Sequence, residues 1–397
     1  MLTIKNIRII DNTQDFSGDI NIENGKIIEV GTHLKTGNEV LDFSDEDVLL
    51  LPAFTDLHTH FRDPGFTYKE DLATGSRAAL HGGYTAVNLM PNTRPVCCTL
   101  ERVREVETRA RQLDLLTVNQ TLSMTQDLAG ENFSHLTSLK NKEVLFVTDD
   151  GKGVNNDIVM QQILEICKQK EITIMQHAED SRYSQTDMRM AENEMTFRDI
   201  KLFSKIGGHL HFCHVSTKEA IAAIAEAQSQ GLNITCEVTP HHLFSTGSEA
   251  NHYRVNPPLR EQEDIDALVA AIQNGVVCAI ATDHAPHSQE DKNNGSPGMI
   301  GIEQAFALSY TALVKSGKIT LQKLVSLLST QPSQMMHLNK GEIVVGKDAD
   351  FAIVDIKTPY KLTIEDILSK SKNTPFIGKE VYGKVLKTIR LGKIYNW

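Results

Sequence analysis

The sequence lacks several patterns that mark whole classes of protein. No apolar stretch reaches the ~18 residues that a transmembrane helix needs, so none is expected. The first residues, Met1–Lys5, contain no signal-peptide core, and no tandem repeat or low-complexity segment occurs. The 40 Lys and Arg residues are outnumbered by 51 Asp and Glu residues, which gives a net charge of −11. We therefore expect neither a membrane nor a nucleic acid as a partner.

Two short motifs are also missing. The six cysteines form no C-x-x-C pair, which disfavours a zinc ribbon or a thioredoxin-like redox site. Several of them stand in apolar runs, so we expect buried, reduced thiols in a cytoplasmic protein. The glycine fingerprint G-x-G-x-x-G is absent, which weighs against a doubly wound dinucleotide-binding sheet.

The two ends of the chain have the texture of short strands and turns. Asn24-Gly25 is a strong hairpin signal between two apolar-rich segments, and Leu391-Gly392-Lys393 suggests another turn near the C-terminus. We predict one small β-sandwich domain built from residues 1–50 and 341–397. Its expected strands are Leu2–Ile10, Asp19–Ile22, Lys26–Val30, Phe351–Asp355 and Val385–Leu391.

Between the ends, short apolar runs alternate with amphipathic stretches. The eight runs are Val48–Leu57, Tyr84–Met90, Leu116–Leu122, Glu143–Thr148, Ile172–Gln176, Leu210–Val215, Ile234–Val238 and Val276–Ala281. Expected helices include Leu100–Gln112, Asp157–Lys170, Thr217–Gln230 and Glu263–Asn274. Eight strand–helix units predict an α/β fold, a (β/α)₈ barrel of the TIM type, over residues 51–340.

Five of these runs end in side chains that could bind a metal ion. In such a barrel the chemistry lies at the carboxyl ends of the strands. His58 and His60 are two residues apart, so on an extended strand both point to one face. The other runs end in Asp149-Asp150, in His177, in His214 and in Asp283.

Each of these residues has an ordinary structural explanation when taken alone. A single histidine after a strand is usually a surface or capping residue, Asp149-Asp150 before a glycine suits a turn, and Asp283 could cap a helix. Together, four histidines and two carboxylates at equivalent strand ends favour zinc or another borderline divalent ion, in a two-ion site. The pattern assigns no role to His209 or His211, and His241-His242 stay ambiguous.

At these residues the chain resembles the bacterial class I dihydroorotases of the amidohydrolase superfamily. The resemblance covers nearly the whole chain in order. Its motifs are Asp56–Gly65, Tyr68–Asp71, Gly82–Thr85, Met90–Thr93, Thr148–Gly151, His177–Asp180, His214–Thr217, Glu237–His242, Val255–Arg260, Ala281–His287 and Asn373–Gly378.

The resemblance implies a role for each matching position. The first Zn²⁺ would be held by His58, His60 and Asp283, and the second by His177 and His214, with Asp150 bridging the two ions. Arg62, Asn92, Asn256 and His287 would bind the substrate, and Gly298 would contact it through its backbone. The implied reaction of pyrimidine biosynthesis is the reversible interconversion of L-dihydroorotate and N-carbamoyl-L-aspartate. A water or hydroxide bridging the ions would attack, and Asp283 would act as general base and then acid.

The chain departs from the family pattern in two places, and several alternatives remain open. The segment between Asp180 and His214 is shorter than in typical members, and Ser296-Pro297-Gly298 replaces the usual Pro-Phe-Gly. Arg62 could instead pair with Asp63 or Glu70. The alternative functions are an allantoinase or hydantoinase, which would favour a lysine bridge, and an inactive scaffold for aspartate carbamoyltransferase. We expect a homodimer, and association with that transferase stays open.

Overall fold

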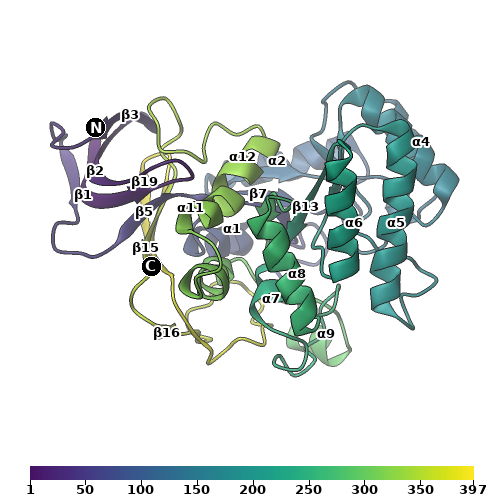
Figure 1. Cartoon of the computed structure of the whole chain (residues 1–397). Helices are drawn as coiled ribbons and strands as arrows, with labels where there is room; N and C mark the ends of the chain where they lie inside the picture. The colour runs from purple at the N-terminus through teal and green to yellow at the C-terminus, as the bar shows by residue number, and fades with distance from the viewer.

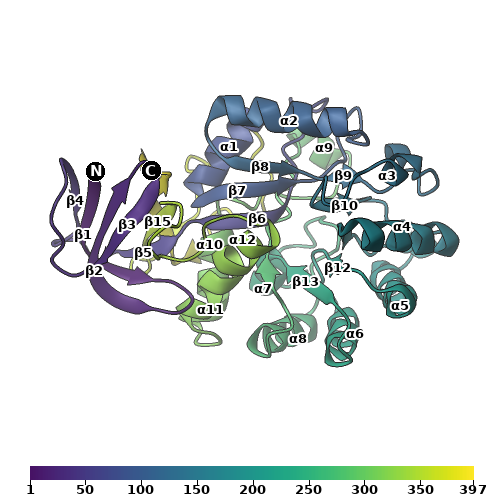
Figure 2. The same ribbon diagram turned by 90° about the horizontal axis from the view of Figure 1, so that it is seen from above.

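Strands from both ends of the chain lie in one sheet. The computed structural model describes residues 1–397. Eight strands hydrogen-bond in the order β19-β18-β15-β5-β1-β2-β3, with β4 paired to β1, and both termini lie at this sheet (Figures 1 and 2). They are β1 Leu2–Ile10, β2 Asp15–Glu23, β3 Lys26–Gly31, β4 Glu39–Asp42, β5 Leu49–Pro52, β15 Phe351–Asp355, β18 Lys384–Arg390 and β19 Lys393–Asn396.

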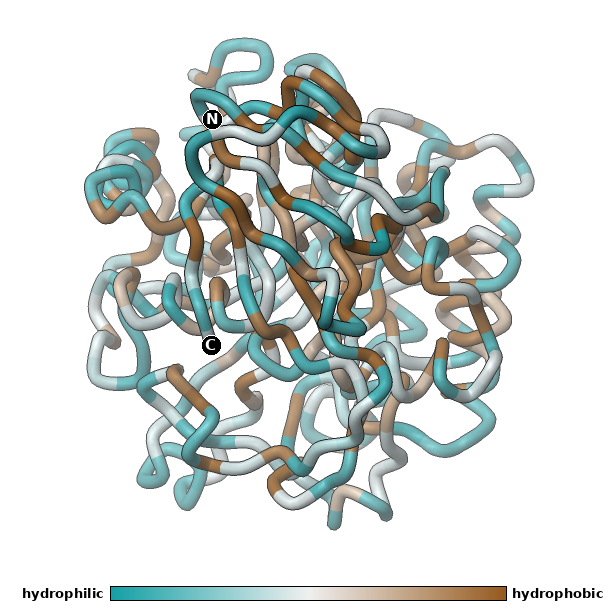
Figure 3. Tube along the Cα trace, turned by 90° about the vertical axis from the view of Figure 1, so that its left-hand side faces the viewer, coloured by the Kyte–Doolittle hydropathy of each residue, from teal (hydrophilic) through white to brown (hydrophobic).

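The turns of this sheet follow from its sequence. Asn24 and Gly25 have φ of 51° and 75°, and Leu391 and Gly392 have 48° and 81°, the positive values that a two-residue hairpin turn requires. Both predicted turns are confirmed. Brown and teal alternate along the strands in Figure 3, because successive side chains of a strand point to opposite faces of the sheet. The apolar side chains on one face contribute to a separate core of 15 buried residues.

The expected (β/α)₈ barrel with an additional β portion is also confirmed. One parallel ladder joins β6-β7-β8 and another joins β9-β10-β11-β12-β13-β14. The ladders meet where Thr121 N donates to Leu89 O at 2.9 Å, and a parallel bridge from Thr59 to His284 closes the barrel. The strands are β6 Phe54–Thr59, β7 Tyr84–Leu89, β8 Thr117–Gln120, β9 Leu122–Ser123, β10 Phe146–Thr148, β11 Thr173–Gln176, β12 Leu210–Phe212, β13 Ile234–Val238 and β14 Ala279–Ile280.

Helices surround the barrel strands, as the view from above shows (Figure 2). Many of them begin at a side chain that accepts backbone N–H groups, as Asp71 does for α1 and Asn156 for α4. The longer helices are α1 Leu72–His81, α2 Leu100–Leu113, α4 Asp157–Lys170, α5 Met188–Ile206, α6 Lys218–Ser229 and α8 Gln262–Gln273. The shorter elements are α3 Ser134–Thr137, α7 Pro240–Phe244, α9 Gln289–Asn293, α10 Ala305–Ser309, α11 Leu321–Val325, α12 Gln331–Met335, a 3₁₀ turn at Gln126–Leu128, π-helical turns at Tyr310–Lys315 and Ser326–Thr330, and a two-stranded ribbon of β16 Tyr360–Lys361 and β17 Glu380–Val381.

The first predicted run, Val48–Leu57, is two strands rather than one. β5 pairs with β1 and β15 in the terminal sheet, whereas β6 pairs with β7 in the barrel. The change of sheet occurs at Ala53, whose N–H donates to Asp350 O at 3.0 Å. All residues of both strands are buried, so the apolar pattern is continuous across the change. The proposed division at residues 50/51 and 340/341 stays a prediction.

No helix is both long and apolar enough to cross a membrane. All six cysteine thiols are free; five are buried, and Cys278 is partly exposed.

A buried ion pair joins the barrel to the terminal sheet. Lys340 Nζ donates to Phe54 O at 3.2 Å and contacts Thr85 Oγ1, and it lies 3.6 Å from Asp350 Oδ2. Asp350 also accepts from Thr85 Oγ1 at 2.6 Å and from Leu391 N at 2.8 Å. Lys340 and Asp350 are each only 5% exposed, so neither charge can turn to water instead.

We expect Lys340→Met to lower the free energy of unfolding by about 3–5 kcal/mol, because it leaves Asp350 as an uncompensated buried charge. Adding Asp350→Asn should recover part of that loss. The measurement is equilibrium urea unfolding. The matched control is Lys357→Met, because Lys357 and its partner Asp47 are 66% and 68% exposed and such a pair contributes only about 0–1 kcal/mol. Equal losses in both variants would contradict the prediction.

Candidate active site

The predicted ligands lie together at the carboxyl end of the barrel strands. Each follows or ends a parallel strand, so the closed barrel brings them to one rim. His58 lies in β6 and His60 follows it, and the others follow β10, β11, β12 and β14 as Asp150, His177, His214 and Asp283.

One buried carboxylate links the first and last strands of the barrel at this rim. Asp56 Oδ1 accepts from the backbone N–H of His58 at 3.1 Å and of Thr282 at 3.0 Å, and Asp56 Oδ2 accepts from Thr282 Oγ1 at 2.5 Å. Burial raises the pKa of Asp56 to about 7, although the Thr282 hydrogen bonds oppose the rise. Asp56 therefore fixes the backbone on both sides of the gap between His58 and Asp283.

The candidate ligand atoms face one another at short range. Asp150 Oδ1 lies 3.2 Å from His58 Nε2, 3.4 Å from His177 Nδ1 and 3.7 Å from His214 Nε2. Asp150 Oδ2 lies 3.5 Å from His60 Nε2, so its two oxygens face different imidazoles. Burial opposes ionisation of Asp150, but the imidazoles, His58 foremost, outweigh it and hold the pKa of Asp150 well below its usual range.

The first predicted ion site is equally compact. Asp283 Oδ1 lies 3.1 Å from His60 Nε2 and 3.7 Å from His58 Nε2, and these three residues offer ligand atoms within 4.8 Å of one another. His58, Asp150 and His214 form a second such group. His177 adds to it, because His177 Nδ1 is 2.9 Å from His214 Nε2.

Acceptors hold the outer ring nitrogen of three of the four histidines. His58 Nδ1 lies 3.0 Å from Glu237 Oε1, and His60 Nδ1 lies 2.8 Å from Asn92 Oδ1. His177 Nε2 lies 2.9 Å from Glu179 Oε2. A ring N–H directed at an acceptor leaves the other nitrogen with its lone pair, which is the tautomer of a metal ligand.

These donors fit divalent metal ions. His58 Nε2 is fully buried, has no hydrogen-bond partner and is directed toward the carboxylates. Tetrahedral N and O ligands at about 2.0–2.2 Å from zinc stand roughly 3.3–3.6 Å apart, and the separations above bracket that range. Imidazole and carboxylate together are the ligand set of zinc and similar ions.

Three residues of this rim have backbone in the left-handed region. Arg62, His214 and Asp283 have φ of 58°, 35° and 46°. For non-glycine residues this conformation costs of order 1–3 kcal/mol and persists only where the surroundings enforce it. Here it accompanies three predicted site residues whose side chains line one cavity.

Ten of the eleven predicted site residues line that cavity, whose volume is about 200 Å³. The exception is His58, which is completely buried beneath it. The ten are His60, Arg62, Asn92, Asp150, His177, His214, Asn256, Asp283, His287 and Gly298.

Arg62 has no carboxylate partner. Its Nε donates to Pro286 O at 3.2 Å, and its Nη2 lies 3.1 Å from His287 Nε2. The alternative pairing with Asp63 or Glu70 is wrong. Asp63 accepts both Nη groups of Arg109 at 2.8 and 2.7 Å, and Glu70 accepts from Ser369 Oγ.

The other predicted substrate contacts already have partners in the protein. Asn92 Nδ2 donates to Asp150 Oδ2 at 3.0 Å, and Asn256 Nδ2 donates to Glu179 Oε2 at 2.8 Å. Gly298 donates its N–H to Arg254 O at 3.1 Å. An added Cβ on Gly298 would lie 3.2 Å from His287 Cδ2, so glycine allows that ring to pack closely. Their role in substrate binding stays a prediction.

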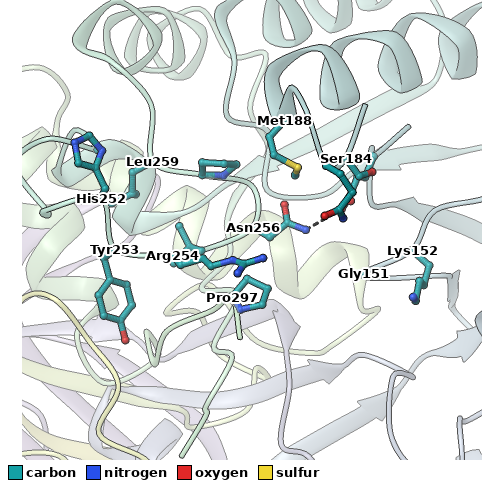
Figure 4. A pocket seen from close by; sticks show the side chains of 15 residues that line it. Gly151, Lys152, Ser184, Met188, His252, Tyr253, Arg254, Asn256, Leu259 and Pro297 are labelled. Atoms are coloured by element: carbon teal, nitrogen blue, oxygen red, sulfur yellow. Dashed lines mark hydrogen bonds between the residues drawn. The ribbon is translucent and has the colours of Figure 1, made fainter. Parts of the chain in front are cut away.

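A larger cavity of about 510 Å³ adjoins the first and shares Gly151, Asn256 and Pro297 with it (Figure 4). Figure 4 shows the Arg254 side chain between Asn256 and Pro297. Ser184 and Met188 also line this cavity, so the shorter segment between Asp180 and His214 reaches the mouth of the site.

The sequence pattern missed a buried charged pair behind His58. Glu237 Oε2 lies 3.1 Å from His211 Nε2, and Glu237 Oε1 meets His58. Burial opposes ionisation of Glu237, but hydrogen bonds from His211 and His58 outweigh it and lower its pKa to about 2. A signal existed, since Thr235 and Glu237 stand two apart in an apolar strand and share its inner face. Of the ambiguous pair, His242 has partners for both ring nitrogens, whereas His241 Nε2 is buried without one.

Comparisons with known proteins identify the family of the chain. A model of the amidohydrolase family matches residues 49–395. The chain is 49% identical over 395 residues to a dihydroorotase of Clostridium botulinum (strain Eklund 17B / Type B), covering 99% of this chain and 98% of the relative. It is 36% identical over 417 residues to a dihydroorotase of Elusimicrobium minutum (strain Pei191), covering 98% and 96%.

Solved structures with the same fold include hydantoinases. The L-hydantoinase of Arthrobacter aurescens matches with a TM-score of 0.89 at 24% identity, covering 99% of this chain and 95% of that one. The dihydropyrimidinase of Brevibacillus agri NCHU1002 matches with a TM-score of 0.86 at 23% identity, covering 99% and 94%. At this identity the likeness shows the fold alone.

We expect Glu237→Gln to weaken metal binding about 10- to 100-fold, because the amide no longer fixes the His58 ring as the carboxylate does. The measurement is a competition titration against a chromogenic chelator. Glu226→Gln, at an exposed position of α6, is the matched control. Unchanged affinity in the Glu237 variant would show that Glu237 does not support the ligand.

Proposed function

The chain belongs to the amidohydrolase family, among its dihydroorotases, and from this premise we propose how its residues interconvert L-dihydroorotate and N-carbamoyl-L-aspartate. Dihydroorotate is a cyclic amide that carries a carboxylate. A site for it therefore needs a cation for the carboxylate and a means of activating water beside the ring carbonyl.

The unpaired guanidinium of Arg62 is the observation that carries the assignment of substrate. A partly buried cation without a carboxylate is costly unless a ligand supplies one. Arg62 lines the same cavity as the candidate metal ligands, and a planar guanidinium can bind a carboxylate through two parallel hydrogen bonds. Arg62 would therefore hold the substrate carboxylate while the ring amide faces Asp283.

We propose two zinc ions as the resident metals. His58, His60 and Asp283 would hold one ion, and His177 and His214 the other. Asp150 would bridge the two, which its oxygens support by facing different imidazoles. Such ions lower the pKa of a bound water from 15.7 to about 7 and polarise a carbonyl oxygen.

Asp283 is the proposed proton carrier. Burial opposes its ionisation, but contact with His60 and the charges of nearby imidazoles outweigh it and hold the pKa of Asp283 well below its usual range. Its Oδ1 meets His60 and His58, whereas its Oδ2 has no partner within the protein. As a carboxylate, Asp283 would accept the proton of the attacking water and deliver it to the ring nitrogen as the amide bond breaks.

The alternative functions have weaker support. The likeness to hydantoinases and a dihydropyrimidinase shows the fold alone. A hydantoinase would favour a lysine as the bridging residue after β10, whereas this chain has Asp150 there. An inactive scaffold would be expected to have lost metal ligands, yet all six positions are retained and lie together. A homodimer, a cytoplasmic location and association with aspartate carbamoyltransferase stay predictions.

The substrate assignment is tested by comparing dihydroorotate with dihydrouracil, the same ring without the carboxylate. We expect the zinc-loaded protein to prefer dihydroorotate strongly and to turn over neither allantoin nor hydantoin efficiently. Arg62→Met should lower kcat/KM for dihydroorotate about 10²- to 10³-fold through loss of the charged pair, and leave kcat/KM for dihydrouracil unchanged. The measurement is the ultraviolet absorbance of the ring amide. No turnover of dihydroorotate by the wild type would refute the proposal.

Asp283→Asn should lower kcat about 10²- to 10⁴-fold, since the amide cannot carry the proton. An amide oxygen can remain near the ion, so bound metal should fall less than in Asp283→Ala. Steady-state kinetics and metal analysis on the same preparations give the two readouts. A metal-replete Asn variant with near-normal kcat would contradict the role.

A further inference from the structure

His287 lies between two positively charged donors. Its Nε2 is 3.1 Å from Arg62 Nη2, and its Nδ1 is 3.2 Å from Lys69 Nζ. The imidazole is almost completely buried, with 9% of the residue exposed. Burial, with the charges of Arg62 and Lys69, lowers the pKa of His287 to about 3, so the ring is neutral near pH 7.

A neutral imidazole cannot satisfy both neighbours. It has one N–H and one lone pair, whereas an ammonium and a guanidinium can only donate. One ring nitrogen of His287 can accept a hydrogen bond from one of these donors. The other nitrogen carries the N–H, which then faces the second donor without an acceptor. An anion that accepts from both this N–H and the second donor removes the conflict.

Lys69 is the donor that the protein holds in place. Its Nζ pairs with Asp291 Oδ1 at 3.2 Å, and only 12% of its side chain is exposed. Asp291 is itself fixed, because its Oδ2 accepts from Ser288 N at 3.0 Å and Ser288 Oγ at 2.6 Å at the start of α9. Ser288 directly follows His287 in the chain. The start of α9 therefore fixes both the backbone next to His287 and the carboxylate that pairs with Lys69.

The backbone of His287 is fixed from the far end of the chain. Asn373 Oδ1 accepts from His287 N at 3.0 Å. Asn373 Nδ2 donates to Ala285 O at 3.3 Å and Gly298 O at 3.2 Å. His287 therefore presents a defined edge to Arg62.

We propose that Lys69 is a positioning residue that donates to His287 Nδ1 and thereby places the ring proton on Nε2, beside Arg62. The Nε2–H of His287 and the N–H groups of Arg62 then converge on one oxygen of the substrate carboxylate. In the bound state only this tautomer leaves every donor with an acceptor. The proposal rests on the proposed function and adds Lys69, which lies in the Tyr68–Asp71 motif but has no predicted role in the site.

The consequence falls on binding rather than on bond breaking. The carboxylate stays an anion throughout the reaction, so a contact to it acts on ground and transition states alike. Without Lys69, the imidazole can turn its lone pair toward Arg62 and lose its N–H for the substrate. A hydrogen bond to a charged group contributes about 1.5–3 kcal/mol, which corresponds to roughly a 10- to 150-fold change in binding.

The test is Lys69→Met in the zinc-loaded protein. We expect KM for dihydroorotate and for N-carbamoyl-L-aspartate to rise about 10- to 100-fold with a much smaller change in kcat, and Lys69→Arg to restore most of the loss. Two-bond ¹⁵N–¹H spectra of histidine-labelled protein report the tautomer, with His287→Gln identifying the signal. In the wild type the ring proton of His287 should lie on Nε2, both in the free protein and in the presence of dihydroorotate and N-carbamoyl-L-aspartate at equilibrium. In Lys69→Met the proton should shift to Nδ1.

Lys370→Met is the matched control. Lys370 lies in the same region and pairs with Asp71 at 2.5 Å, without contact to His287. The KM of the Lys370→Met variant and the tautomer of its His287 should therefore match the wild type. An unchanged KM together with an Nε2–H tautomer in Lys69→Met would overturn the proposal. Absence of dihydroorotate turnover by the wild type would refute the proposed function instead, and the spectra of the free proteins would still decide the role of Lys69.

Discussion

The site depends on closure of the barrel between its first and last strands. Asp56 makes that junction by accepting two backbone N–H groups and one hydroxyl from residues on both sides. His60 N adds a hydrogen bond to His284 O at 2.9 Å. The end of β6, with His58 and His60, is thereby held against the segment after β14, with Asp283. Without this junction nothing would hold together the two strand ends that carry the residues of the predicted first ion site, His58, His60 and Asp283.

Once closed, the rim assembles groups that would not gather on their own. Asp150 and Asp283 are like charges, and each is kept ionised by the imidazoles around it against the cost of burial. Arg62, His214 and Asp283 also sit in left-handed backbone. The packed strands and helices beneath them enforce both conditions, so the stability of the barrel maintains a rim that is locally unfavourable.

Much of the candidate site could be predicted from the sequence because its candidate ligands end or follow strands. A parallel barrel converts the end of a strand into a place at the rim, so His58, His60 and His177 could be placed from periodicity alone. The support could be predicted only in part: the spacing of Thr235 and Glu237 places them on one face of a strand, but it does not show that Glu237 meets His211 and His58 from other strands. The same limit explains Val48–Leu57, where two strands buried in different sheets produce one continuous apolar run.

Those distant contacts also explain how an acidic chain can bind an anion. Arg62 has acidic residues close by in the sequence, Asp63 and Glu70, and either would neutralise it if free. The fold diverts both, since Asp63 is held by Arg109 from α2 and Glu70 by Ser369 from the C-terminal segment. The net charge of −11 therefore has little influence at this point, because the local field follows from where the carboxylates are held. The proposed role of Arg62 in binding the substrate carboxylate therefore depends as much on the partners of Asp63 and Glu70 as on Arg62 itself.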